Sequence, residues 1–161
     1  MRQSRSLLES FRYAFTGLWY AFRTQRNMRV HTLTATIVVV LGQLLLLPQQ
    51  DFISVLTAIM VVMVAEMVNT AVESAVDVAT GEYHPLAKVA KDVAAGAVLL
   101  AATGALVLGV WVFGPRLGRL PHALRHWLTR DPLGLVVMIL VVAAVAVLAW
   151  IAPAREGGGR R

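Results

Sequence analysis

The chain has 161 residues, of which 58% are hydrophobic and only 15% charged, with a formal net charge of +6. This composition is too apolar for an ordinary soluble domain, and about 20 apolar residues are enough to cross a bilayer. Cysteine is absent, which excludes disulfides, zinc–thiolate sites and cysteine nucleophiles. In a membrane protein, excess basic residues more often set orientation and hold anionic headgroups, so we expect no nucleic-acid partner.

The N-terminal segment 7–23 reads LLESFRYAFTGLWYAFR and is typical of an amphipathic helix that lies on the membrane surface. Leucine and phenylalanine side chains fall on one side of this helix, with charged and hydroxyl groups on the other. Arg23, Arg26 and Arg29 follow at the entry to the first membrane helix. They either hold phosphate or lipid headgroups or form a solvated flank that sets orientation.

Four apolar segments then predict an all-α integral membrane bundle. Three uncharged runs cover 32–50, 93–115 and 133–154, and the segment 52–72 is interrupted only by Glu66. We expect membrane helices at about 32–47, 52–80, 86–113 and 133–152. The connection PQQD is short enough to make the first two antiparallel neighbours.

One polar stripe crosses the second of these helices. Glu66, Asn69, Glu73 and Asp77 are separated by offsets that return to nearly the same helix face. Fourteen uncharged residues lie between Asp51 and Glu66. A carboxylate this deep in an apolar helix costs at least a few kcal/mol, so functional use is the first hypothesis. The alternative is a buried acid that pairs with a base to hold helices together.

The segment that follows the stripe favours anion binding. The helix is expected to stop at Gly81, and EYHPLAKVAKD comes next. Pro85 suits the first turn of the following helix, with His84 near its cap. Free backbone N–H groups at that helix start, together with Lys88 and Lys91, make a reasonable phosphate site.

The C-terminal third contains fewer candidate functional residues. A basic linker over 114–132 predicts a short interfacial helix, in which His122 and His126 stand at metal-binding spacing without a third ligand. The segment 133–152 is apolar all round and is typical of an anchor. We expect the tail 153–161 to be disordered.

Basic residues predict the orientation. Eleven of the fifteen Lys and Arg lie in the N-terminal segment, the 77–92 loop and the tail. Both termini and that loop are therefore expected in the cytoplasm. The four arginines in 114–132 oppose this orientation without outweighing it.

The residues expected at the cytoplasmic end favour phosphoryl transfer. Carboxylates beside an amide suit Mg²⁺, which borrows phosphate oxygens from its substrate. A lysine and a helix start suit polyphosphate, and a carboxylate in apolar surroundings is a competent general base near neutral pH. No GxxxxGK[ST] loop or kinase-type glycine loop is present.

The stretch AEMVNTAVESAVDVATGEYHPLAKVAKDVAAGAVLL resembles the signature of the prokaryotic diacylglycerol kinase family, small integral-membrane lipid kinases. The form HPLAKVAKDVAAGAV is closer to its undecaprenol kinase branch. SFRYAFTGLWYAFRTQRNMRVH resembles the N-terminal half of that branch, so the likeness covers about 8–113.

The resemblance implies roles for the stripe. Glu66 matches the catalytic base that takes a proton from the lipid hydroxyl. Glu73 matches the carboxylate that holds Mg²⁺ on the phosphates of ATP, and Asn69 matches the asparagine beside them. The remaining matches are cofactor-binding residues that contact the nucleotide: Tyr13, Glu82, Tyr83, His84, Lys91 and Asp92.

The chain departs from the family pattern in two places. The family has a second metal-binding glutamate in a T-E-x-N context, whereas this chain reads Thr24-Gln25-Arg26-Asn27. A Gln25 oxygen can ligate Mg²⁺ but brings no charge. Family members also commonly end after three membrane helices, whereas this chain continues past 114.

These observations predict an ATP-dependent kinase of a membrane lipid alcohol in the bacterial inner membrane, with its active site facing the cytoplasm. Undecaprenol is the expected substrate and diacylglycerol the alternative. The resemblance also implies a homotrimer with active sites shared between protomers. Two other classes stay open: a small proton-coupled transporter, because membrane acids also relay protons, and a non-catalytic lipid-binding member.

Overall fold

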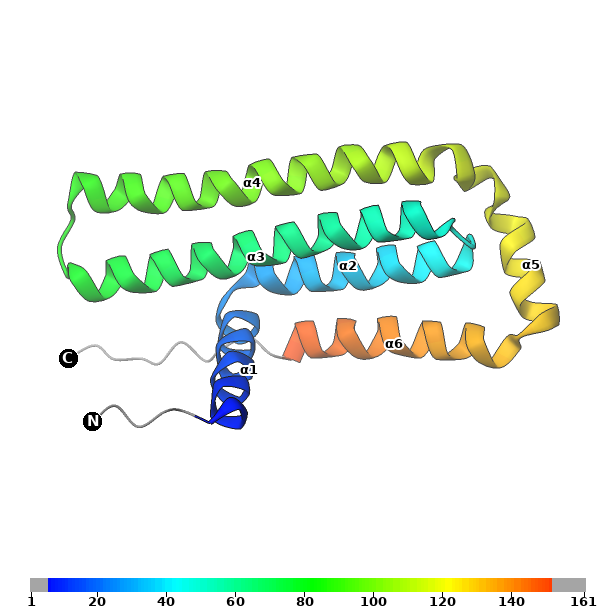
Figure 1. Ribbon diagram of the computed structural model, residues 1–161, viewed down its shortest axis with the longest axis horizontal. Coiled ribbons are helices and arrows are strands. Elements are labelled where there is room, and N and C mark those ends of the chain that lie inside the picture. Colours follow the sequence, from blue (N-terminus) through cyan, green and yellow to red (C-terminus); the bar gives the residue numbers. More distant parts are fainter. Residues whose placement is uncertain (1–5, 152–161) are drawn as a thin grey trace.

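The computed structural model describes residues 6–151, and within them the chain forms six α-helices and one 3₁₀ segment (Figure 1). No strand occurs in this range. The expected disordered tail lies outside the described residues. The elements are α1 (Leu7–Thr24), α2 (Arg26–Leu44), α3 (Gln49–Ala79), α4 (Pro85–Phe113), η1 (Gly114–Arg119), α5 (Leu120–Arg130) and α6 (Pro132–Ile151).

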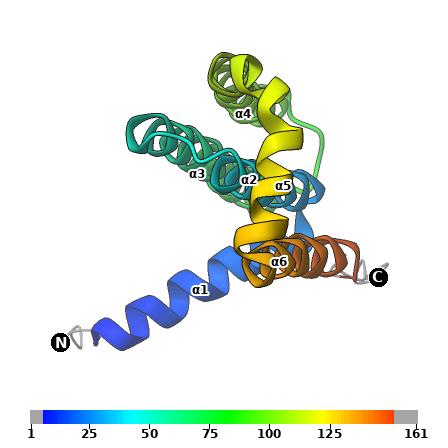
Figure 2. The same cartoon turned by 90° about the vertical axis from the view of Figure 1, so that its right-hand side faces the viewer.

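The first helix begins at a capping box and projects from the bundle. The Ser6 hydroxyl accepts the Glu9 amide at 3.2 Å, and the Glu9 carboxylate accepts the Ser6 amide at 3.1 Å. Figure 2 shows α1 extending away from the other helices. Leu7, Phe11 and Phe15 are exposed along it, so its apolar side has no protein cover and suits a membrane surface.

A single residue, Gln25, separates α1 from α2. Its backbone is extended, with φ −101° and ψ 119°, and its side chain does not cap α2. The helix expected over 32–47 consequently starts at Arg26 and ends at Leu44. The sharp bend at Gln25 changes the direction of the chain within one residue, so α2 begins directly after it without a connecting loop.

The α2–α3 turn is a Schellman motif that explains the early end of α2. The Leu47 amide donates to Gly42 O at 3.0 Å and the Leu46 amide to Gln43 O at 3.1 Å. Leu46 takes a left-handed φ of 52°, a position usually filled by glycine, and Pro48 then prevents further helix. The expected antiparallel pairing of these two helices is confirmed.

Helices α4, α3, α2 and α6 lie side by side in that order (Figure 1). His84 caps α4, because its Nδ1 accepts the Leu86 amide at 3.2 Å, and Pro85 opens the helix. The apolar core lies near the α2–α3 turn around Val55, Val112 and Phe113. The opposite end of the α3–α4 pair is therefore left for polar side chains.

The C-terminal extension crosses the turn end of the bundle through η1 and α5, and returns as α6 (Figures 1 and 2). Arg116 forms an ion pair with Asp51 at the start of α3. The Trp127 indole donates to Leu44 O at 3.1 Å. These contacts hold the extension against the α2–α3 turn, and the short interfacial helix expected in 114–132 is present as α5.

By length and composition, three helical stretches within residues 6–151 suffice to cross a membrane: α3, the continuous stretch Pro85–Arg130 and α6. The expected helical bundle with membrane-spanning helices is thereby confirmed. Helix α2 is not among the three, since Arg29, His31 and several threonines lower its hydropathy. It nevertheless lies between α3 and α6, so its crossing stays a prediction.

Candidate active site

The polar stripe of α3 is buried at its deep end and exposed at its outer end. The Glu66 residue is 1% exposed and Asn69 7%, Glu73 is half-buried, and Asp77 is exposed. Eleven residues at 1.5 Å each put Asp77 roughly 16 Å beyond Glu66 along the helix. The stripe therefore runs from a buried position to an exposed one. We call the surroundings of Glu66 its deep end, those of Glu73 its middle tier and those of Asp77 its outer tier.

Glu66 at the deep end meets His31 of α2. His31 Nε2 lies 3.3 Å from Glu66 Oε1, at an angle that makes no well-directed hydrogen bond. Glu66 is the largest fully buried side chain in residues 6–151. A buried carboxylate requires a polar or cationic partner, and His31 is placed to be that partner. Sequence analysis missed His31; its only signal was an imidazole at the start of an apolar run.

The middle tier surrounds Glu73 with two amides. Asn69 Nδ2 donates to one carboxylate oxygen of Glu73 at 2.9 Å, and Gln25 Nε2 donates to the other at 3.1 Å. Gln25, which stands where the family resemblance led us to expect a glutamate, thus contacts Glu73, the carboxylate that the same resemblance assigns to the metal. Asn69 Oδ1 is buried and, within residues 6–151, has no hydrogen-bond partner.

The donor set around Glu73 fits a metal ion that arrives with a nucleotide. In the described part of the chain, no three His, Cys, Asp or Glu residues gather as a metal cluster. Mg²⁺ is usually bound through one or two carboxylates with the rest from water and phosphate. Glu73 supplies one carboxylate, and the unpartnered Asn69 oxygen supplies a neutral ligand. Gln25 presents its amide nitrogen to Glu73 and must rotate to offer oxygen.

The outer tier consists of two lysine–aspartate ion pairs. Lys91 forms an ion pair with Asp77 across the α3–α4 interface, and Asp92 pairs with Lys88 one turn away. Lys91 and Asp92, both expected to contact the nucleotide, therefore have separate partners within the described residues. Neighbouring residues on a helix point about 100° apart, and only Lys91 is oriented toward α3.

The remaining expected nucleotide contacts are exposed and distant from Glu66. Glu82, Tyr83 and His84 lie in the α3–α4 loop, where Tyr83 is 80% exposed. Tyr13 lies on the projecting α1, with the Arg12 guanidinium 5.3 Å from its ring centroid. The chain brings Glu66, Asn69, Glu73 and Gln25 together but leaves the four expected nucleotide contacts apart from them.

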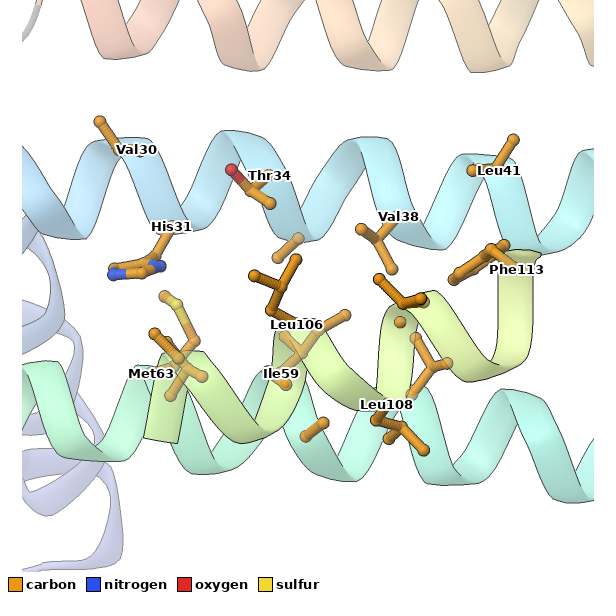
Figure 3. Close-up of a pocket in the computed structure, with 18 of the residues that line it drawn as sticks. Val30, His31, Thr34, Val38, Leu41, Ile59, Met63, Leu106, Leu108 and Phe113 are labelled. Carbon is orange, nitrogen blue, oxygen red and sulfur yellow. The ribbon is translucent and has the colours of Figure 1, made fainter. Parts of the chain in front are cut away.

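An apolar cavity of about 590 Å³ runs between α2, α3 and α4, from His31 toward the α2–α3 turn. Figure 3 shows His31 at one end of it, near Met63, and Phe113 at the other. Its wall is otherwise apolar, with Thr34 and His31 as its polar members. This shape suits an elongated hydrocarbon whose polar end lies beside His31 and Glu66.

Comparison with known proteins gives a consistent picture. Residues 12–113 match the family described as prokaryotic diacylglycerol kinase. The chain is 50% identical over 105 residues to a diacylglycerol kinase of Synechocystis, covering 65% of this chain and 60% of that protein. It is 38% identical over 109 residues to the undecaprenol kinase of Bacillus subtilis, covering 68% and 89%.

A diacylglycerol kinase of Escherichia coli K12 is more distant, at 29% identity over 101 residues, or 63% of this chain and 83% of that protein. No solved structure shows significant similarity to the chain. The family match ends at residue 113, so η1, α5 and α6 lie outside it.

Proposed function

The chain belongs to the prokaryotic diacylglycerol kinase family, a family of lipid kinases, and from this premise we propose that it phosphorylates a membrane lipid alcohol with ATP. The lipid hydroxyl oxygen attacks the γ-phosphorus, a new O–P bond forms, and the bond to ADP breaks. The hydroxyl proton passes to Glu66. The products are a lipid monophosphate and ADP.

One observation carries the proposal: the buried carboxylate of Glu66 contacts His31, and His31 lines the polar end of an apolar cavity. A lipid alcohol needs an apolar path for its chain and a base at its hydroxyl. The cavity supplies the first and Glu66 the second. Its volume of about 590 Å³ takes the chain segment nearest the hydroxyl, and the rest extends into the bilayer.

His31 acts on the reaction through Glu66. Its imidazole lies 3.3 Å from the carboxylate, between Glu66 and the cavity that it lines, and would stabilise the ionised base. It is a positioning residue in this proposal. The same imidazole lines the cavity, so it also limits where the hydroxyl can lie.

The nucleotide would occupy the middle and outer tiers. When bound, Mg²⁺ supplies charge neutralisation on the phosphates, and Glu73, Asn69 and Gln25 are the residues that would hold it. Lys91 would exchange its exposed partner Asp77 for phosphate oxygens, as a lysine readily does. By resemblance, Asp92, Glu82, Tyr83, His84 and Tyr13 contact the rest of the nucleotide.

A homotrimer with shared sites is part of the proposal. Tyr13 and the α3–α4 loop are exposed and far from Glu66 in one protomer. In a trimer, Tyr13 and the α3–α4 loop of a neighbouring copy would complete the site around Glu66. The active site would face the cytoplasm of the inner membrane, with both termini on that side.

Undecaprenol is the proposed substrate, supported by the HPLAKVAKDVAAGAV signature and by the Bacillus subtilis relative. Diacylglycerol is the second candidate, because the Synechocystis relative named for it is 50% identical. A non-catalytic lipid-binding protein is the third, favoured by the neutral Gln25 beside Glu73. A proton-coupled transporter is the fourth, since a buried acid beside His31 also suits a proton relay.

Transfer of labelled phosphate from ATP in detergent micelles separates these candidates. Purified protein is given undecaprenol or diacylglycerol, each with and without Mg²⁺. We expect labelled undecaprenyl phosphate only with Mg²⁺, and the ratio of initial rates assigns the substrate. No labelled lipid from protein shown to be folded and trimeric would contradict the kinase proposal and leave the binding and transport candidates.

A further inference from the structure

A second groove lies on the opposite side of α2, between that helix and the C-terminal helix α6. Its volume is about 640 Å³. The last turns of α6 reach the junction of α1 and α2, as Figure 1 shows. The groove is lined by Arg26, Arg29, Val30, Leu33, Ala146, Ala149 and Trp150.

The two arginines give this groove a cationic mouth. Within residues 6–151, neither Arg26 nor Arg29 forms an ion pair. Arg29 donates one hydrogen bond to Arg23 O at 3.0 Å, which orients it and leaves other guanidinium donors available. Because the two residues stand three apart on α2, their side chains share one helix face.

The remainder of the groove is apolar. Val30 and Leu33 continue the α2 side away from the arginines, and Ala146 and Ala149 form the facing wall on α6. The alanines leave room between the helices because they carry no bulk beyond Cβ. A cationic mouth that leads into an apolar slot is complementary to an anionic amphiphile.

The groove differs from the site around Glu66 in position and origin. His31 lines the cavity among α2, α3 and α4, whereas Arg26 and Arg29 line the groove shared with α6. The facing wall comes from residues beyond the family match, which ends at 113. The groove therefore depends on the extension of this chain.

We propose that the α2–α6 groove binds an anionic phospholipid of the surrounding bilayer. Its phosphodiester lies between Arg26 and Arg29, and an acyl chain lies along Leu33, Ala146 and Ala149. A bilayer lipid fits better than the phosphorylated product, because the cavity beside Glu66 shares only Val30 with the lining of this groove. The proposal goes beyond kinase activity and does not depend on it.

Trp150 provides the probe, because it lines the groove and is 85% exposed. The full-length chain, with Trp19 and Trp111 changed to phenylalanine, is reconstituted in phosphatidylcholine vesicles. Trp127 is kept because its indole holds the extension, and the same chain with Trp150→Phe gives the Trp127 signal to be subtracted. Two vesicle samples are compared: in one, phosphatidylglycerol carries bromine near the headgroup end of its acyl chains, and in the other, phosphatidylcholine does. We expect Trp150 quenching to report enrichment of phosphatidylglycerol on the order of tenfold, since two arginines act on its phosphate.

Matched variants test the assignment. Arg26→Gln with Arg29→Gln should abolish the preference for phosphatidylglycerol, whereas Arg26→Lys with Arg29→Lys should retain most of it. Arg119→Gln with Arg125→Gln removes the same charge elsewhere and should leave it unchanged. Equal quenching by both lipids, or a preference that survives the double glutamine variant, would overturn the proposal. So would enrichment of brominated phosphatidic acid without phosphatidylglycerol, because that pattern identifies a product site.

Discussion

Helices α3 and α6 are both long and apolar enough to cross a membrane, yet they differ in what they bury. The most apolar windows have mean hydropathies of 2.1 in α3 and 3.0 in α6. Helix α3 buries Glu66, Asn69 and Thr70, whereas α6 buries none of its residues. Within residues 6–151, buried polar side chains are thus confined to α3, which packs against both α2 and α4.

This difference shows where a membrane helix can contain buried functional side chains. Polar groups in hydrocarbon are expensive unless neighbouring helices satisfy them. Helix α3 lies between α2 and α4, which bring His31 to Glu66, Gln25 to Glu73 and Lys91 to Asp77. Helix α6 packs on α2 along one side only and offers no such enclosure.

The largest expected effect is loss of phosphate transfer in Glu66→Gln. The change keeps the shape of the side chain but removes its basicity, and general base catalysis contributes about 10²–10⁴-fold. The measurement is the initial rate with lipid alcohol and MgATP. Asp51→Asn, which removes a carboxylate from the other end of α3, is the matched control and should retain activity. Full turnover by Glu66→Gln would remove the base assignment.

His31→Gln should lower kcat about tenfold to a hundredfold, because a buried charged group that loses its partner bears a desolvation penalty of about 1–3 kcal/mol. The Michaelis constant for MgATP should stay unchanged, since His31 faces the lipid cavity. Steady-state kinetics with each substrate varied in turn separates the two constants. His122→Gln on α5 is the control, and an equal loss in both variants would contradict a role specific to Glu66.

Ala58→Phe should raise the Michaelis constant for the lipid about fivefold by filling part of the cavity. The same substitution at Ala143, an exposed position of α6, should have no such effect. Lipid titration at saturating MgATP provides the measurement. Equal behaviour of the two variants would show that the lipid does not use the α2–α3–α4 cavity.

Gln25→Glu should lower the Mg²⁺ concentration for half-maximal activity about threefold to tenfold, since it adds a second carboxylate beside Glu73. Without metal the two carboxylates repel, so the melting temperature in chelator should fall and recover with Mg²⁺. Gln50→Glu on the first turn of α3 is the control. An unchanged Mg²⁺ requirement would place the metal away from Gln25.

The smallest expected effect on activity comes from removing 120–161. This truncation keeps Arg116 and its ion pair with Asp51, so the rate per folded protomer should change by less than about twofold. The lost Trp127 bond to Leu44 O should lower stability by about 1 kcal/mol. Thermal unfolding and initial rates are the measurements; a large fall in kcat would give the extension a catalytic part.

Sequence periodicity was sufficient for features that lie along one helix. The stripe on α3 and the His84–Pro85 start of α4 follow from helix geometry and capping rules, which are local. The single-residue junction at Gln25 was not foreseen, because an extended residue between two helices leaves no loop signature in composition.

Pairings between helices were less predictable. His31 reaches Glu66, and Lys91 reaches Asp77, only through the rotation of α2 and α4 about their axes. That rotation is set by packing around Val55, Val112 and Phe113, which depends on the whole bundle. An imidazole or a lysine in the sequence does not specify which neighbour it faces.

The most direct test of the central claim is photocrosslinking with an undecaprenol analogue that carries a diazirine next to its hydroxyl. The protein is irradiated in micelles and the labelled peptides are identified by mass spectrometry. If the lipid presents its hydroxyl to Glu66, the label falls on α2 and α3 around His31, Met63 and Glu66, and excess unlabelled undecaprenol removes it. Label confined to α6 or to the outer face of α4 would contradict the claim.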